Sequence, residues 1–302
     1  MGMLNRLKTD GETTMQLQKI LLILDKPNRP QTALKRTRRI LRDSKTPVQV
    51  EVVSFLNDHL IAHAGVFEAK KRKELKKALL TQHKEWLADL YKADALLPAP
   101  RVVWSHNLVD WVRDNAHEFD LVVKTAGGSK RARSATDWAL LNACPTHLLL
   151  VGHRRVRQPQ SVLVGLDMEK SDGVHKALNR KVIDAACTLA ALSKARVHAA
   201  CVVEVNPALI DLDLVSEKQA ARRLKAASED RLNKLLKADV SIKRHFPVGP
   251  IGQAMADCAK AVSADVVVVG AREQNLKSAL GLGSAAQRIV RKAPCDVLAV
   301  RG

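Results

Sequence analysis

The run KILLILD, Lys19–Asp25, is apolar without interruption up to its final aspartate, and SVLVGLD, Ser161–Asp167, repeats the pattern. Continuous apolar runs of this length indicate strands buried on both faces, as in parallel sheets. The chain has 302 residues, so the second run begins near its middle. A repeat of about half the chain is too long for a solenoid and indicates duplication of a whole domain.

The segments after each run alternate between helix and strand patterns in the same order. In the first half we expect strands over 48–55, 101–104, 120–124 and 146–151, and helices over 32–41, 68–95 and 108–116. In the second half we expect strands over 197–205, 241–246, 265–269 and 296–300, and helices over 174–192, 216–236, 251–262 and 285–292. This alternation predicts two tandem doubly wound α/β domains, each with a five-stranded parallel sheet and helices on both faces.

The domain boundaries follow from the repeat. We expect a disordered extension over residues 1–15, because that stretch has no apolar segment typical of a secretory signal. The first domain is expected over 16–152 and the second over 161–302. Residues 153–160, HRRVRQPQ, are polar and rich in arginine, which favours a surface linker.

Charge is the unusual feature of the composition. The chain has 50 Lys and Arg against 31 Asp and Glu, a net charge of +19, and the excess is spread over both halves. Such a charge attracts nucleic acid or anionic surfaces. We favour a solvated basic surface, because no nucleic-acid-binding motif is present and aromatic residues make up only 3% of the chain. The lysine-rich stretch over 70–77 is interpreted in the same way.

Other residue patterns exclude several classes of protein. Five scattered cysteines, none spaced as C-x-x-C, exclude a disulfide framework or zinc knuckle and favour buried thiols in a reducing, cytoplasmic compartment. No apolar run is long enough to span a membrane. His59 and His63 are spaced for a helical metal site but have no evident third ligand, so we expect no metal. No catalytic motif is found.

The end of the second half carries a family resemblance. Gly270-Ala271-Arg272-Glu273 follows the fourth strand, and Gly283-Ser284 opens a helix that leads to Ala293-Pro294-Cys295. This resembles the universal stress protein family, whose nucleotide-binding members show Gly-x-x-Gly, nine residues, and then Gly-Ser or Gly-Thr. The first half, from Ala135-Thr136-Asp137-Trp138 to Cys144-Pro145, resembles the N-terminal domain of tandem members. The resemblance covers residues 16–301 and implies the universal stress protein, or adenine nucleotide alpha hydrolase-like, fold.

The resemblance implies a site for ATP or another adenine nucleotide in the second half, with these candidate residues: Asp167, Val202, Gly270, Arg272, Gly283, Ser284 and Ala285. Family members place the matching aspartate beside the ribose and adenine, and the residue matching Val202 contacts adenine through its backbone. The physics agrees, because a glycine at a strand end allows close approach of a phosphate and free N–H groups at a helix N-terminus bind anions. Glu273, which replaces the second motif glycine, argues against the site, although Arg272 and Lys277 would offset its charge. Ordinary turn and cap roles are the alternative.

The first half is expected to be poor in ligand contacts. No Gly-Ser pair opens the helix after its fourth strand, and Asp25 alone keeps its family position. We expect Gly127–Arg133 to be a flexible basic loop rather than an anion site, and Trp138 to fill the space that a nucleotide would take.

We therefore expect a cytoplasmic stress-response binding protein without catalytic residues. Its halves are expected to pack as a pseudo-dimer with their last strands adjacent, and a further homodimer stays open. The alternatives are a nucleotide-free scaffold for a protein or small apolar ligand, a basic binder of nucleic acid or anionic surfaces, and a weak ATPase.

Overall fold

The computed structural model describes residues 17–27, 29–56, 69–91, 96–129, 132–153, 158–168, 172–204, 216–236, 241–271 and 284–302. The expected extension over 1–15, half of the expected linker (residues 154–157), and His59 and His63 lie outside the described residues.

Each half contributes five strands to one sheet, in the order in which the sequence predicts them. The first half contains β1 (Lys19–Leu24), α1 (Thr32–Asp43), β2 (Gln49–Leu56), α3 (Ala69–Tyr91), β3 (Arg101–Trp104), α4 (Leu108–Asn115), β4 (Leu121–Thr125), β5 (Gly128–Ser129), β6 (Ala132–Arg133), α5 (Ala135–Ala143) and β7 (His147–Val151). The second half contains β8 (Ser161–Gly165), α6 (Gly173–Ser193), β9 (Arg196–Ala200), α8 (Glu217–Leu236), β10 (Lys243–His245), α9 (Ile251–Ala261), β11 (Val266–Ala271), α10 (Ser284–Lys292) and β12 (Asp296–Arg301).

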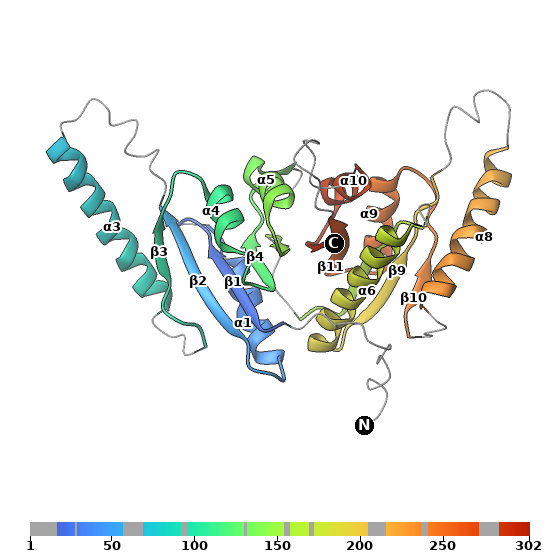
Figure 1. Cartoon of the computed structure of the whole chain (residues 1–302), viewed down its shortest axis with the longest axis horizontal. Coiled ribbons are helices and arrows are strands. Elements are labelled where there is room, and N and C mark those ends of the chain that lie inside the picture. Colours follow the sequence, from blue (N-terminus) through green and yellow to red (C-terminus); the bar gives the residue numbers. More distant parts are fainter. Residues whose placement is uncertain are drawn as a thin grey trace.

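The strands form a ten-stranded sheet in the order β10-β9-β8-β11-β12-β7-β4-β1-β2-β3 (Figure 1). Pairing is parallel within each half, and the halves join where β12 pairs antiparallel with β7 through Val297 and Leu150. The doubly wound fold and the predicted adjacency of the last strands are therefore confirmed.

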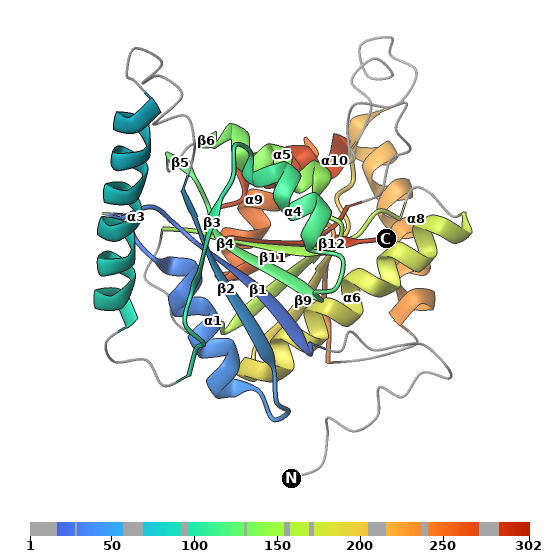
Figure 2. The ribbon, with the colours of Figure 1, turned by 60° about the vertical axis from the view of Figure 1, so that its left-hand side comes forward.

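Helices cover both faces of the sheet (Figure 2). Side chains of α1, α3, α6 and α8 pack into one apolar core, and those of α4, α5, α9 and α10 pack into the other. Alternate residues of β1 divide between the cores, so Leu22 faces the first and Leu21 the second, each with 0% of its surface exposed. This burial on both faces is what the uninterrupted apolar run predicts.

The matched aspartates before the fourth strands have the same structural role in both halves. Asp120 Oδ2 accepts hydrogen bonds from the backbone N–H groups of Gln18 and Lys19, each at 2.7 Å. Asp265 Oδ2 accepts from those of Gln160 and Ser161, at 2.7 and 3.3 Å. Each aspartate thus satisfies the backbone donors that lead into the first strand of its half, which accounts for its presence in the repeat.

Three local expectations are corrected. The strand expected over 197–205 ends at Ala200, with a single further bridge from Val203 to Val248, and the strand expected over 241–246 narrows to β10. The loop expected to be irregular after β4 contains a hairpin, in which β5 pairs with β6. Gly128 enables this hairpin because its φ of 88° is favourable only for glycine.

Histidine burial predicts how stability depends on pH. His83, on α3, is 6% exposed and its Nε2 lies 2.8 Å from Ser54 Oγ on β2. Burial lowers the pKa of His83, and burial is also the main cause of lowered pKa values at His147, His198 and His245. Because the unfolded chain binds protons more readily at these groups, the free energy of unfolding should fall as pH drops below about 6.5.

Urea denaturation between pH 8 and pH 5 measures this effect. His83→Gln, which keeps a hydrogen-bonding partner for Ser54, should make the loss at low pH smaller. An equal pH dependence in the wild type and the variant would contradict a role for His83.

Candidate functional site

The candidate residues of the second half gather at the carboxyl-terminal edge of the sheet. Asp167 follows β8, Val202 follows β9, and Gly270 lies near the end of β11. These three strands are neighbours in the order β9-β8-β11, so the residues share one edge, as predicted. Arg272 and Gly283 lie outside the described residues, as do Glu273, Lys277 and Gly281.

Asp167 is half-buried beside β9. Its backbone carbonyl accepts a hydrogen bond of 2.8 Å from Asn179 Nδ2 on α6, which fixes the turn after β8. Burial, and to a lesser extent the nearby Asp167 carboxylate, raise the pKa of Cys201 to about 12. The Cys201 thiol is therefore protonated at neutral pH, and the carboxylate of Asp167 supplies negative charge at this edge.

Gly270 has a packing role that sequence reasoning did not foresee. A Cβ atom at this position would lie 2.8 Å from Leu178 Cδ2, a distance at which one of the two must move. The glycine therefore allows α6 to pack against β11, which accounts for it without any phosphate. The sequence could not reveal this contact, because it depends on the path of α6 across the sheet.

Two charged residues at this edge were missed. Glu204, after β9, accepts hydrogen bonds of 3.0 and 3.1 Å from Arg288 Nη1 on α10. Its Oε1 also accepts one of 3.2 Å from the Ile251 N–H at the start of α9. Glu204 thus joins the N-terminus of α9 to α10 across the edge and neutralises Arg288.

Helix α10 begins at this edge without an acidic side chain. Ser284 is exposed, Ala285 is half-buried and Ala286 is buried, and the first turn contains no Asp or Glu. The first N–H groups of a helix have no partner within the helix, and the helix dipole adds partial positive charge there. The first turn of α10 is therefore suited to an anion.

In the first half, the position that matches the start of α10 is the start of α5, and a side chain of the protein occupies it. Asp137, fully buried in the first turn of α5, accepts a hydrogen bond of 2.6 Å from the Gly127 N–H through Oδ2. Lys124 Nζ, on β4, donates to its Oδ1 at 3.0 Å. Asp137 and the N-cap residue Ser134 also form a reciprocal capping box. A carboxylate of the protein thus takes the donors that an anionic ligand would need.

The two halves can be compared residue by residue at this point. Counting back from Pro145 and Pro294, Asp137 corresponds to Ala286; counting from Asp120 and Asp265, Lys124 corresponds to Val269. A buried ion pair in the first half is thus replaced by two apolar residues in the second. Sequence reasoning missed Asp137, although Ser134-x-x-Asp137 is a recognisable capping-box signal.

Trp138, next to Asp137 in the first turn of α5, remains a candidate to fill the space that a nucleotide would take. Trp138 is half-buried, and the guanidinium carbon of Arg291 on α10 lies 5.9 Å from its ring centroid. The indole thus faces the second half of the chain. Asp25 lies beside Gln31, whose Oε1 accepts a hydrogen bond of 3.1 Å from the Asp25 N–H.

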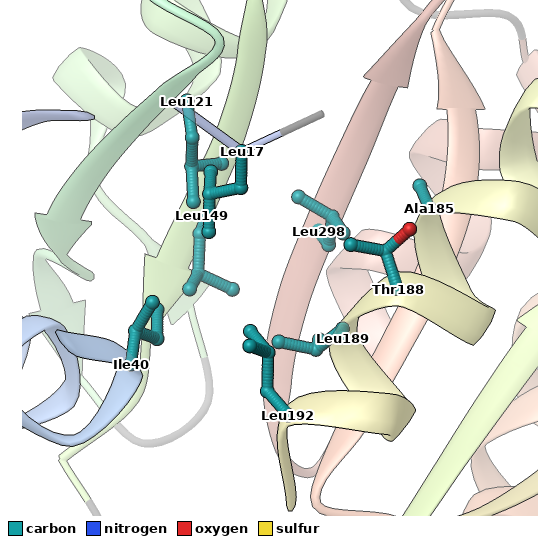
Figure 3. Close-up of a pocket in the computed structure, with 9 residues that line it drawn as sticks. All are labelled: Leu17, Ile40, Leu121, Leu149, Ala185, Thr188, Leu189, Leu192 and Leu298. Atoms are coloured by element: carbon teal, nitrogen blue, oxygen red, sulfur yellow. The ribbon is translucent and has the colours of Figure 1, made fainter. Parts of the chain in front are cut away.

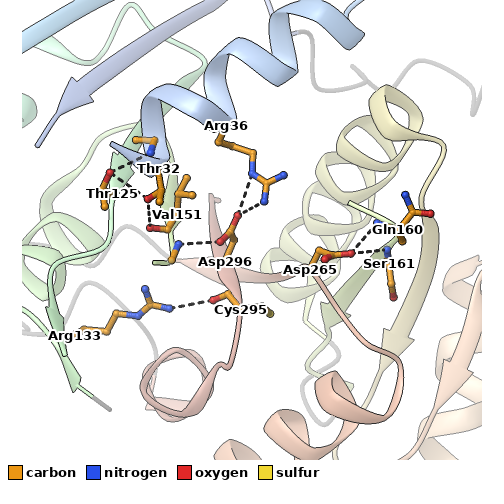
Figure 4. Close-up of polar contacts among 12 residues, drawn as sticks. Thr32, Arg36, Thr125, Arg133, Val151, Gln160, Ser161, Asp265, Cys295 and Asp296 are labelled. Carbon is orange, nitrogen blue, oxygen red and sulfur yellow. Dashed lines mark hydrogen bonds and ion pairs between the residues drawn. The ribbon is translucent and has the colours of Figure 1, made fainter. Parts of the chain in front are cut away.

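A buried ion pair links the two halves (Figure 4). Arg36 on α1 donates to Asp296 Oδ2 at the start of β12 from Nη2 at 2.7 Å and from Nε at 3.1 Å. The Gly152 N–H donates to Asp296 Oδ1 at 2.8 Å, and Arg133 Nη2 donates to the Cys295 carbonyl at 3.4 Å. Burial raises the pKa of Asp296, while Arg36 and Gly152 oppose that shift.

An apolar crevice also lies between the halves, on the face that carries α1 and α6 (Figure 3). It is narrow and partly open to solvent, and its free volume of about 20 Å³ is little more than one water molecule needs. Apart from Thr188 its lining is apolar: Leu17, Ile40, Leu121, Leu149, Ala185, Leu189, Leu192 and Leu298. This crevice is separate from the carboxyl-terminal edge and offers contacts only to an apolar group.

Metal ligands do not cluster in the described part of the chain: no group of three or more His, Cys, Asp or Glu side chains there could hold an ion. Of the helices described, none is long and apolar enough to cross a membrane. The five cysteines are free, and all except the half-buried Cys187 are buried, as predicted.

Comparison with known proteins shows which family the second half of the chain matches. The model of the universal stress protein family matches residues 159–301. The second half of the chain belongs to the universal stress protein family. A relative that spans the whole chain is the Universal stress protein E homolog of Haemophilus influenzae, which is 22% identical over 303 residues, covering 95% of this chain and 98% of that protein. The similarity to this relative thus extends over both halves of the chain.

A solved structure gives the same fold over most of the chain. A putative universal stress protein from Pseudomonas aeruginosa UCBPP-PA14 superposes with a TM-score of 0.68 at 18% identity, covering 95% of this chain and 94% of that chain. A universal stress protein solved in complex with cAMP matches 48% of this chain and 98% of its own, with 29% identity and a TM-score of 0.30.

Proposed function

We propose that this universal stress protein is a cytoplasmic binding protein whose second half holds ATP or another adenine nucleotide as a signal. The ligand would lie at the carboxyl-terminal edge of β8, β9 and β11. Asp167 and Val202 would face its ribose and base, and Ser284 and Ala285 at the start of α10 would donate to its phosphates. Gly270, Arg272 and Gly283 complete the proposed site through the family resemblance.

The proposal depends on one difference between the halves: the first turn of α5 contains the acid Asp137, and the matching residue of α10 is Ala286. In the first half a buried carboxylate accepts from the Gly127 N–H and pairs with Lys124, so an incoming phosphate would meet a negative charge whose donors are already engaged. In the second half the matching residue is Ala286, and the first turn of α10 carries no acid. Of the two matching helices, α5 has an acid in its first turn and α10 has none, so α10 is the one suited to an anion. We therefore assign one nucleotide to the chain, not two.

Moving the carboxylate into the second half tests the proposal. Ala286→Asp should weaken ATP binding at least about tenfold, because the new carboxylate would place a negative charge at the start of α10 and repel the phosphates. Isothermal titration of the whole chain with ATP measures the affinity and the number of sites. Mass spectrometry of small molecules released on denaturation tests for nucleotide carried through purification.

Ala286→Asn is the matched control, since it adds the same bulk and polarity without the charge. It should retain affinity within about threefold of the wild type. Equal ATP affinity in the Asp variant and the wild type would contradict the assigned position. A wild-type chain that binds no ATP would contradict the proposal itself and show that Glu273 prevents binding.

The apolar crevice supports a second candidate function. A nucleotide-free scaffold, whose ligand is a protein or a small apolar molecule, would use the crevice between α1 and α6 to hold one apolar group of that partner, because the crevice is too narrow to enclose more. Binding there would be unaffected by Ala286→Asp, because the crevice lining does not include the carboxyl-terminal edge. The two candidates are therefore distinguished by the same pair of variants.

A further inference from the structure

Two helical arms flank the sheet, one in each half. We define the arms as residues 70–77 of α3 and 218–225 of α8. Each helix follows the carboxyl end of one strand and leads back to the amino end of the next, so the arms lie toward the carboxyl-terminal edge. Figure 1 shows both projecting on that side, at opposite ends of the sheet.

The arms concentrate the positive charge of the chain. Their basic residues are Lys70, Lys71, Arg72, Lys73, Lys76, Lys77, Lys218, Arg222, Arg223 and Lys225, and their only acid is Glu74. They thus hold nine of the nineteen net positive charges in sixteen residues. Every arm side chain is exposed except Ala220 and Ala221, which are half-buried.

Lys76 Nζ packs over the Trp104 ring, 4.5 Å from its centroid, but the two helices are anchored to the sheet at later turns. Helix α3 is anchored by its later turns, through His83 and Leu87, and α8 by Leu232 and Leu236, all buried. Within the arms, like charges one turn apart, such as Lys73 and Lys77 or Lys218 and Arg222, repel each other. Like charges one helical turn apart thus occur in both arms, although repulsion between them is unfavourable. An anionic partner would relieve the repulsion in both arms.

We propose that the two arms together bind the phosphate backbone of double-stranded nucleic acid. A bilayer fits poorly, because membrane-surface helices need an apolar face and Lys70 to Lys73 point around the whole circumference of α3. Single strands usually need aromatic stacking platforms, and neither arm contains an aromatic residue. Backbone contacts from Lys and Arg require neither feature.

The spacing of the arms sets the length of the partner. Nine strand spacings separate β3 from β10, which at about 4.8 Å each amounts to about 43 Å. A duplex rises 3.4 Å per base pair, so at least about 13 base pairs are needed, because the arms lie outside the two ends of the sheet (Figure 1). A stiff duplex shorter than this can contact only one arm, and one long enough to reach both can contact them together.

Fluorescence anisotropy of the whole chain with labelled DNA tests the inference. At 50 mM KCl a 24-base-pair duplex should bind at least about tenfold more tightly than an 8-base-pair duplex, after correction for overlapping sites. Its affinity should fall steeply between 50 and 200 mM KCl as counterions are released. A 24-nucleotide single strand should bind more weakly than the duplex.

Matched variants locate the contacts. Two triple variants each remove three charges from one arm and should lose most of the advantage of the long duplex. One combines Lys70→Gln, Lys73→Gln and Lys77→Gln, and the other combines Arg222→Gln, Arg223→Gln and Lys225→Gln. They should also reduce the salt slope by about 2 to 3. The control is Lys45→Gln, Arg196→Gln and Lys243→Gln, three exposed residues at the opposite edge. It loses the same charge and should retain the length advantage.

The inference would be overturned by no binding at 50 mM KCl, or by equal weakening by the arm and control variants. Equal affinity for the long and short duplexes would also overturn it, because the arms would then not act together. Binding to vesicles of phosphatidylglycerol at matched phosphate concentration, tighter than to duplex, would assign the arms to a membrane surface instead. Nucleotide binding in the second half is measured separately with ATP, so the two proposals can fail independently.

Discussion

Asp296→Ala is expected to lower the free energy of unfolding by about 3–5 kcal/mol, because it leaves Arg36 charged and buried between the halves. Arg36 is 5% exposed and Asp296 is 6% exposed. The carboxylate accepts from two guanidinium nitrogens and from the Gly152 N–H. Removing it leaves these donors without that acceptor inside the protein, where water replaces it poorly.

Urea denaturation at pH 7, followed by far-ultraviolet circular dichroism, measures the loss. The double variant Arg36→Met with Asp296→Leu removes both charges and should recover most of the stability, since a buried pair replaced by apolar residues is often neutral. Glu51→Ala breaks the exposed pair between Arg101 and Glu51 and should cost less than about 1 kcal/mol. A loss below about 1 kcal/mol for Asp296→Ala would show that the pair does not hold the halves together.

The sequence predicted the sheet well because its signal is local and duplicated. The apolar run Lys19–Asp25 and its counterpart Ser161–Asp167 indicated buried strands, and the structure buries both. The join between the halves was predicted from the family resemblance and is confirmed by pairing of β7 with β12. The Arg36–Asp296 pair was not predictable, because its members are 260 residues apart and neither lies in a motif.

The candidate site was predictable only in part. Its edge follows from strand order, so Asp167, Val202 and Gly270 were placed correctly relative to each other. The contact of Gly270 with Leu178 depends on helix packing and gave no sequence signal. Asp137 did have one, the capping box with Ser134, but its partner Lys124 lies on a preceding strand. That Asp137 and Lys124 close the first-half site could therefore be recognised only from the three-dimensional structure.

Asp137→Ala should also cost about 3–5 kcal/mol, because Lys124 would be left buried without its carboxylate. The Lys124 side chain is 11% exposed, and Asp137 is fully buried. The same change removes the acceptor for the Gly127 N–H and half of the capping box. Thermal or urea denaturation measures the loss, which should greatly exceed that of Asp257→Ala, an exposed partner of Lys260.

The second half suggests a second substitution that should restore the stability lost in Asp137→Ala. Its residues at the matching positions are Val269 and Ala286, an apolar pair that the fold already tolerates. Lys124→Val combined with Asp137→Ala should therefore be more stable than Asp137→Ala alone, because no buried charge is left unpaired. A double variant less stable than the single one would show that the two sites are not equivalent.

Inorganic phosphate distinguishes an anion site from an ordinary ion pair. If Asp137 occupies a position suited to an anion, phosphate should bind the Asp137→Ala variant near Lys124 and the Gly127 N–H and raise its midpoint of denaturation. A ligand present at 100 times its Kd stabilises the folded state by about 2.7 kcal/mol. The wild type and the double variant should respond less, since one already holds a carboxylate and the other lacks the lysine. Equal responses of all three to phosphate, with chloride at matched ionic strength as reference, would mean that Asp137 only caps α5. A selective response would show that the first half closed its anion site with a single side chain, which is the change that Ala286→Asp would make in the second.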